Sequence, residues 1–202
     1  MTLLLDNIIF SLQKSGGVSK VWSELLHRIL DDNQLDPNFL MYPNSNIFAN
    51  KISISKKQIQ PINSLLPLSI ERYLQPSIKD FKGVFHSSYY RYIKNKHVFN
   101  ITTVHDFTYE YFRKGLPKVI HSYQKSKAIL NADHIICVSK HTKCDLLKFY
   151  PKISPSKITV VHNGVDTVFQ ISESKAFLKN HVPPRQCRHM TPNVERPLAH
   201  FG

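Results

Sequence analysis

A buried strand that ends in two polar residues stands out at residues 98–106, whose sequence is VFNITTVHD. The β-branched and aromatic residues between positions 98 and 104 are typical of a strand inside a sheet. His105 and Asp106 follow directly, where such a strand would end. Because open parallel sheets bind ligands at the carboxyl ends of their strands, we expect this stretch to place an imidazole beside a ligand cleft.

Short apolar runs alternate with amphipathic stretches on both sides of this strand. Residues 43–67 show weak periodicity and are expected to be irregular. The alternation predicts an α/β, Rossmann-like fold with a mostly parallel sheet and helices on both faces. Further strands are expected at residues 3–10, 38–42, 83–86, 132–138 and 158–161, and helices at residues 18–30, 70–81, 116–131 and 140–150.

Composition narrows the class of protein. The 202 residues are 42% hydrophobic, which is enough for one domain core and argues against a wholly disordered chain. Lys and Arg number 27 against 14 Asp and Glu, for a net charge of +13. This surplus favours an anionic partner, whether membrane phospholipid, nucleotide or nucleic acid.

The apolar runs and the cysteines indicate where in the cell the protein is found. The opening apolar run is interrupted by Asp6, so we expect no signal peptide, and no run has the length of a membrane span. The three cysteines have no metal-ligand spacing. We therefore expect a cytoplasmic protein without a metal, associated with the inner face of the membrane only at its surface.

Two glycines, Gly16 and Gly17, separate the first expected strand from the helix at residues 18–30. Glycine allows close approach of a ligand to the backbone, and a helix start offers unpaired N–H groups to an anion. The known phosphate-loop patterns are not present, so a turn that needs glycine only for its backbone angles is an equal interpretation.

Three other positions have both a chemical and a structural interpretation. His105 could hydrogen-bond a sugar hydroxyl with Asp106 fixing its tautomer, or be a satisfied structural histidine. Ser139 is interpreted first as the N-cap of the helix at residues 140–150, because its hydroxyl stands directly before that helix, with a ligand contact as the alternative. No G-x-S-x-G surrounds it, which argues against a nucleophile. Asn163 and Gly164 form a turn signal.

In order and spacing, these segments resemble the retaining glycosyltransferases of GT-B architecture, over residues 3–168. Besides Gly16-Gly17 and His105-Asp106, the resemblance rests on ADHIICVS at residues 132–139 and ITVVHNGVD at residues 158–166. It implies the amino-terminal, acceptor-side domain of a GT-B fold, in a family that includes many mannosyl- and glucosyltransferases.

The resemblance also implies roles for individual residues. His105 and Asp106 would be catalytic, beside the reacting sugar. Donor or acceptor contacts would come from Gly16, Gly17, Ser139, Asn163 and Gly164. The reaction would need neither metal nor cofactor, because a nucleotide sugar is the donor substrate.

Family members hold the nucleotide sugar in a second domain that carries an E-x7-E motif, and residues 167–202 contain only Glu173 and Glu195, at another spacing. Prolines also accumulate after residue 172. We expect residues 169–202 to be a disordered or aberrant tail of a truncated chain, with a flexible natural tail as the alternative. The chain alone is then expected to be inactive.

The functional hypothesis is a truncated glycosyltransferase of lipopolysaccharide or other surface polysaccharide biosynthesis. Its intact parent would transfer a hexose, mannose or glucose, from a nucleotide sugar to a lipid-linked or saccharide acceptor. The alternative is a basic protein that binds nucleic acid or anionic membrane, supported by the net charge and by residues 89–96, YYRYIKNK. No known nucleic-acid motif accompanies that charge.

Overall fold

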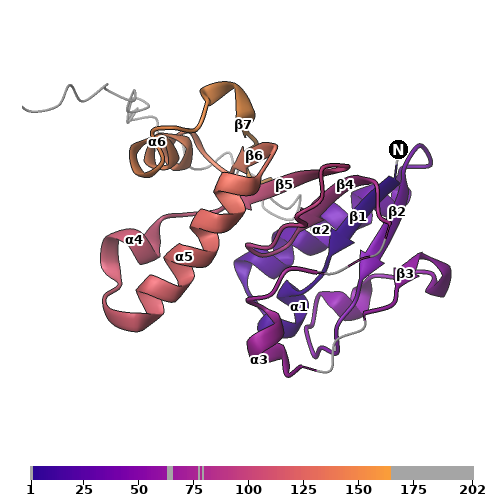
Figure 1. The fold of residues 1–202 in the computed structure, drawn as a ribbon. Helices are drawn as coiled ribbons and strands as arrows, with labels where there is room; N and C mark the ends of the chain where they lie inside the picture. Colours follow the sequence, from indigo (N-terminus) through magenta and orange to yellow (C-terminus); the bar gives the residue numbers. More distant parts are fainter. Residues whose placement is uncertain (1, 63–65, 77, 79, 165–202) are drawn as a thin grey trace, which may run out of the picture. The chain divides into compact units, whose positions relative to one another are not determined.

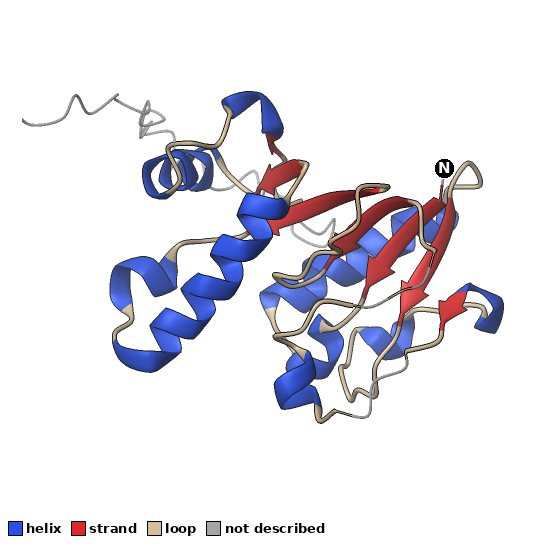
Figure 2. Ribbon diagram, viewed as in Figure 1, coloured by secondary structure: helices blue, strands red, loops and turns tan. Residues whose placement is uncertain are grey.

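A seven-stranded parallel sheet organises the part of the chain that the computed structural model describes, residues 2–62, 66–76, 78 and 80–164 (Figures 1 and 2). Residues Met1–Gly164 form one compact unit. The strand order is β3-β2-β1-β4-β5-β6-β7, and every neighbouring pair is parallel. The strands are β1 Thr2–Asp6, β2 Asp36–Leu40, β3 Ile59–Gln60, β4 Gly83–Ser87, β5 Val98–Val104, β6 His134–Cys137 and β7 Ile158–Val160.

One face of the sheet is covered by helix α2, Gly17–Asp31. Trp22 and Leu26 of α2 are buried together with Leu5 of β1 and Phe39 of β2. The spacing of four residues puts Trp22 and Leu26 on the same side of the helix. Burying a large apolar side chain contributes about 1.5–3 kcal/mol, so this cluster holds α2 against the strands.

The opposite face is covered by helices α5, Gly115–Asn131, and α6, Lys140–Phe149. Ile129 of α5 is buried against Val104 of β5, and α6 joins the same cluster. The register of β1, β4 and β5 places Leu5 and Val104 on opposite faces of the sheet, because side chains alternate along a strand. The expected α/β, Rossmann-like fold with helices on both faces is therefore confirmed.

Most expected elements begin and end within two residues of the observed ones, and the expected strand at 98–104 matches β5 at both ends. The segment expected to be irregular, 43–67, contains the short 3-10 helices Ala49–Lys51 and Lys56–Gln58 and the edge strand β3. A third 3-10 helix, Pro155–Lys157, precedes β7. Helix α4, Thr108–Phe112, was not anticipated, because one turn leaves no periodic pattern.

The strand expected at residues 3–10 is too long. Strand β1 ends at Asp6, and the chain then turns into the short helix α1, Ile9–Leu12. Residues 8–10 remain almost completely buried. The apolar run therefore reflects burial and not extended backbone.

The helix expected at residues 70–81 is wrong, since only one turn forms, α3 at Leu68–Glu71. Pro76 has no backbone N–H to donate to a helix. The carbonyl of Leu74 accepts a hydrogen bond from Arg91 Nε at 2.9 Å instead of from a helical amide. The tail at residues 169–202 lies outside the described residues.

Candidate functional site

The direction in which strands are added to the sheet reverses at β1, since β2 and β3 extend it on one side and β4 to β7 on the other. Ligands of open α/β sheets bind in the crevice at such a switch point, at the carboxyl ends of the strands. A cavity of about 280 Å³ lies there. Most of its lining residues come from the segments after β1, β4 and β5 in the sequence, and one is on α5. They include Gln13, Ser88, Tyr90, His105, Asp106 and His121.

His105 lines this cavity directly after the end of β5. Its backbone carbonyl accepts a hydrogen bond from Thr142 Oγ1 of α6 at 3.3 Å, which anchors the strand end. Burial lowers the pKa of the imidazole, Asp106 acts in the opposite direction, and Lys125 adds to the lowering. A neutral imidazole results, which can both donate a hydrogen bond to a sugar hydroxyl and accept one from it.

Asp106 also lines the cavity, but its carboxylate accepts the backbone N–H of Thr108 at 2.9 Å and so shapes the start of α4. Among the described residues no hydrogen bond joins this carboxylate to the His105 ring. The tautomer-fixing contact that the sequence suggested is therefore not formed in this arrangement.

Two buried polar side chains behind the cavity were not anticipated from the sequence. His86 of β4 shares a hydrogen bond between its Nε2 and Thr103 Oγ1, 2.9 Å apart, and its ring meets the edge of Trp22 at 5.0 Å. Burial, with a smaller effect from His105, lowers the pKa of His86 to about 4. A histidine within a short apolar strand was the only signal for it.

Lys125 of α5 is the second, with a fully buried side chain. Its ammonium donates to the backbone carbonyl of Asp106 at 2.9 Å and to Glu110 Oε2 at 2.8 Å. The ammonium also lies 4.6 Å from the centre of the Phe107 ring. Lys125 thus ties α5 and α4 to the strand end that presents His105.

A comparison with known families identifies the family of the chain. The model of Glycosyltransferase Family 4 matches residues 66–169, just over half of the chain. The chain belongs to this glycosyltransferase family. The matched range contains His105, Asp106 and the other cavity residues that follow β4 and β5. A comparison with curated proteins found no match.

In this family 4 domain, the Gly16-Gly17 turn adjoins the cavity, because its neighbours Gln13 and Val18 line it. A Cβ atom added to Gly17 would meet nothing within 4 Å, whereas one added to Gly16 would collide with the Gln13 side chain. A side chain at position 16 would therefore require the flexible Gln13 side chain to move, whereas Gly17 leaves open space beside the cavity. A ligand contact at this turn stays a prediction.

Ser139, Asn163 and Gly164 are not among the described residues that line the cavity. Ser139 Oγ accepts the backbone N–H of Thr142 at 3.0 Å, so the predicted N-cap of α6 is confirmed. Asn163 and Gly164 lie exposed beyond β7. Substrate contacts by these three residues remain predictions.

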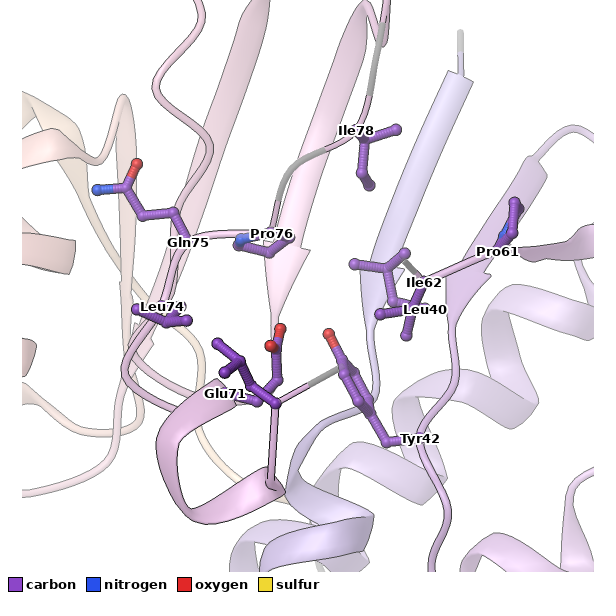
Figure 3. Close-up of a pocket in the computed structure, with 10 residues that line it drawn as sticks. Leu40, Tyr42, Pro61, Ile62, Glu71, Leu74, Gln75, Pro76 and Ile78 are labelled. Carbon is purple, nitrogen blue, oxygen red and sulfur yellow. The ribbon is translucent and has the colours of Figure 1, made fainter. Parts of the chain in front are cut away.

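A separate cavity of about 210 Å³ lies beside β2, with mostly apolar walls and the polar side chains of Tyr42, Glu71 and Gln75 (Figure 3). Tyr42 and Glu71 are already engaged by Arg91, whose Nη1 donates to Tyr42 Oη at 2.7 Å and whose Nη2 donates to Glu71 Oε1 at 3.1 Å. Arg91 also pairs with Asp6 Oδ2 at 3.4 Å. This network stabilises the interior and leaves the cavity without a free charge from these groups.

The burial of Arg91 also weakens the case for nucleic-acid binding by residues 89–96. Arg91 is only 2% exposed, and Tyr89 and Tyr90 line the cavity of His105 instead of forming an exposed basic patch. The helices in the described part of the chain include none with the length and apolar character needed to cross a bilayer.

Proposed function

We propose that this family 4 domain holds the acceptor in metal-independent, retaining transfer of a hexose from a nucleotide sugar. The observation that carries the proposal is the partly buried imidazole of His105 in the cavity at the switch point of the sheet, where burial lowers its pKa. Such a group can orient an acceptor hydroxyl and hydrogen-bond the reacting sugar. A lipid-linked or saccharide acceptor of surface polysaccharide synthesis is the class we favour.

The donor would be held by a second domain across the cleft. The resemblance assigns the nucleotide contacts to an E-x7-E motif, and residues 167–202 lack it. Electrostatic stabilisation of the departing phosphate is usually the largest catalytic contribution. We therefore expect the 202-residue chain alone to show no transfer and no submicromolar binding of a nucleoside diphosphate by calorimetry.

A chimera tests the role of His105. A carboxyl-terminal domain of the same family, joined after Asp166, should restore transfer to this chain. His105→Ala should then lower turnover by about 10²- to 10³-fold, the usual effect of removing one orienting or charge-stabilising contact. His97→Ala, which removes an exposed histidine, is the matched control and should retain full turnover. Equal turnover of the His105→Ala and parent chimeras would show that His105 is structural.

Surface attachment to an anionic membrane is favoured by the outside of α4 and α5. Phe112, Leu116 and Tyr123 are 80%, 69% and 63% exposed, and the basic residues Arg113 and Lys114 stand between them in the sequence. Apolar and basic side chains together bind anionic bilayers. Flotation should recover the chain with anionic vesicles more than with neutral ones, and less as salt rises, whereas equal recovery would exclude this attachment.

A further inference from the structure

A second cavity, of about 300 Å³, adjoins the cavity of His105. The two share four lining residues, Arg72, Tyr89, Tyr109 and His121. The second cavity is completed by Tyr73 and by Leu116, Pro117 and Ile120 from the first turns of α5. A ligand that fills both would therefore be continuous from α5 to the end of β5.

Two polar atoms at this junction have no hydrogen-bond partner among the described residues. They are Arg72 Nε and His121 Nδ1, and both are buried. The rest of the Arg72 guanidinium is held in place, since Nη2 donates to Tyr89 Oη at 2.8 Å. Tyr109 holds the His121 ring by stacking on it at 3.9 Å. Buried polar atoms without a protein partner usually bond a ligand or ordered water.

Arg72 gives the second cavity a positive charge. Its described lining contains Arg72 and His121 but no carboxylate. The nearby carboxylate of Glu110 is already engaged by Lys125 at 2.8 Å and by Ser122 at 3.0 Å. A ligand with several acceptor oxygens and negative charge is therefore complementary to these donors.

The outer wall is apolar and open. Leu116 is 69% exposed, Ile120 is 39% exposed, and the neighbouring Tyr73 is 47% exposed. Exposed apolar side chains that line a cavity favour an apolar ligand portion, because covering them removes surface from water.

We propose that this cavity is an acceptor subsite for a phosphate ester that carries an apolar chain. The phosphate binds Arg72 and His121, and the chain lies across Leu116 and Ile120. The shared lining residues then direct the sugar end of the acceptor toward His105. That the bound phosphate ester is the acceptor rests on the proposed function, but its binding can be measured without transfer.

Calorimetry on the full 202-residue chain tests the ligand chemistry with three probes: farnesyl phosphate below its aggregation concentration, inorganic phosphate and farnesol. Farnesyl phosphate should bind at least about tenfold more tightly than either fragment, because charged hydrogen bonds and apolar burial both contribute. Equal binding of inorganic phosphate would exclude a site for the chain. Equal binding of farnesol would exclude a phosphate site.

Matched variants locate the site. Arg72→Gln should weaken farnesyl phosphate binding by about tenfold or more, the usual effect of losing a hydrogen bond to a charged group. Arg113 lies over the Tyr109 ring but is not among the described residues that line the cavity. Arg113→Gln removes the same charge at this exposed position and should change binding by less than about threefold, because exposed charges are screened. Equal losses in the two variants would show attraction by net charge without a site.

Leu116→Glu covers the case in which Arg72→Gln does not fold, because Leu116 is exposed and its replacement leaves the core intact. It should also weaken binding by about tenfold, through lost apolar contact and repulsion of phosphate. Leu130→Glu, at a 57% exposed position about 20 Å further along α5, is the control. Equal binding by the Leu116→Glu and Leu130→Glu variants would overturn the subsite.

The two proposals fail separately. Arg72-dependent binding of farnesyl phosphate with no transfer by the chimera would leave the subsite in place and remove the proposed function. Transfer by a chimera in which Arg72→Gln changes neither farnesyl phosphate binding nor KM would remove the subsite alone.

Discussion

Two arginines of this domain, Arg91 and Arg72, differ in the contacts that their guanidinium groups make. Each donates to a tyrosine hydroxyl, Arg91 to Tyr42 at 2.7 Å and Arg72 to Tyr89 at 2.8 Å. The remaining contacts of Arg91 go to two carboxylates and a backbone carbonyl, whereas the buried Nε of Arg72 has no partner among the described residues. Paired charge stabilises the interior, and the buried donor without a partner among the described residues supports the proposed subsite.

The strongest test of this contrast is to remove each arginine in turn. Arg91→Ala leaves Asp6 and Glu71 without their shared counter-charge and should lower the free energy of unfolding by about 3–5 kcal/mol. Arg72→Ala should cost less, no more than about 2.5 kcal/mol, because it removes one hydrogen bond and the contacts of the guanidinium with the Tyr73 and Tyr89 rings but leaves no carboxylate without its counter-charge. Urea denaturation of the 202-residue chain measures both. Equal losses would mean that Arg72 is as structural as Arg91.

The second prediction concerns His86, whose burial should make the stability of the domain depend on pH. Its folded pKa of about 4 lies below the ordinary value of 6.5, so the unfolded chain binds more protons between these values. Stability should therefore fall as the pH drops from 6.5 to 4, by about 3 kcal/mol from this residue, since each pKa unit corresponds to about 1.4 kcal/mol. His105 and His121 also have lowered pKa values and act in the same direction.

The measurement is urea denaturation at several pH values in this window. His86→Gln should flatten the dependence, although the variant is less stable at pH 7. His97→Gln, at an exposed position, should keep the full slope. An unchanged slope in His86→Gln would show that other groups take up the protons.

The smallest expected effect is at Ser139, a polar side chain whose hydrogen bond is local and complete. Ser139→Ala removes the N-cap of α6 and should lower the free energy of unfolding by about 1 kcal/mol. In the chimera, turnover should change little if the cap is its main role. A loss of turnover far beyond the loss of stability would instead support the ligand contact suggested by the family resemblance.

Local pattern predicted much of the fold because burial and periodicity coincide in most elements. The strand at 98–104 alternates buried and less buried residues, and Ser139 stands directly before a helical pattern. The expectation failed at residues 70–81, where the carbonyl of Leu74 is taken by the distant Arg91. A contact across 17 positions leaves no trace in local periodicity.

The candidate site was predictable only in part. His105 follows a strand end and could be singled out from the sequence, and the structure places it in a cavity. Arg72, His121 and Lys125 carried no such sign, because a basic residue in a helical or irregular stretch is ordinarily solvated. Their importance comes from neighbours at other positions, such as Tyr89 beside Arg72 and Glu110 beside Lys125.

The sequence by itself determined the class of sheet, the strand that presents His105 and the resemblance to glycosyltransferases, because these depend on the order of local patterns along the chain. Only the tertiary structure decided that Arg91 pairs with two carboxylates, whereas the buried Nε of Arg72 has no hydrogen-bond partner among the described residues. The physical reason is that the energy of a buried charge depends on which donors and acceptors surround it in space. That surrounding is assembled from segments far apart in the sequence.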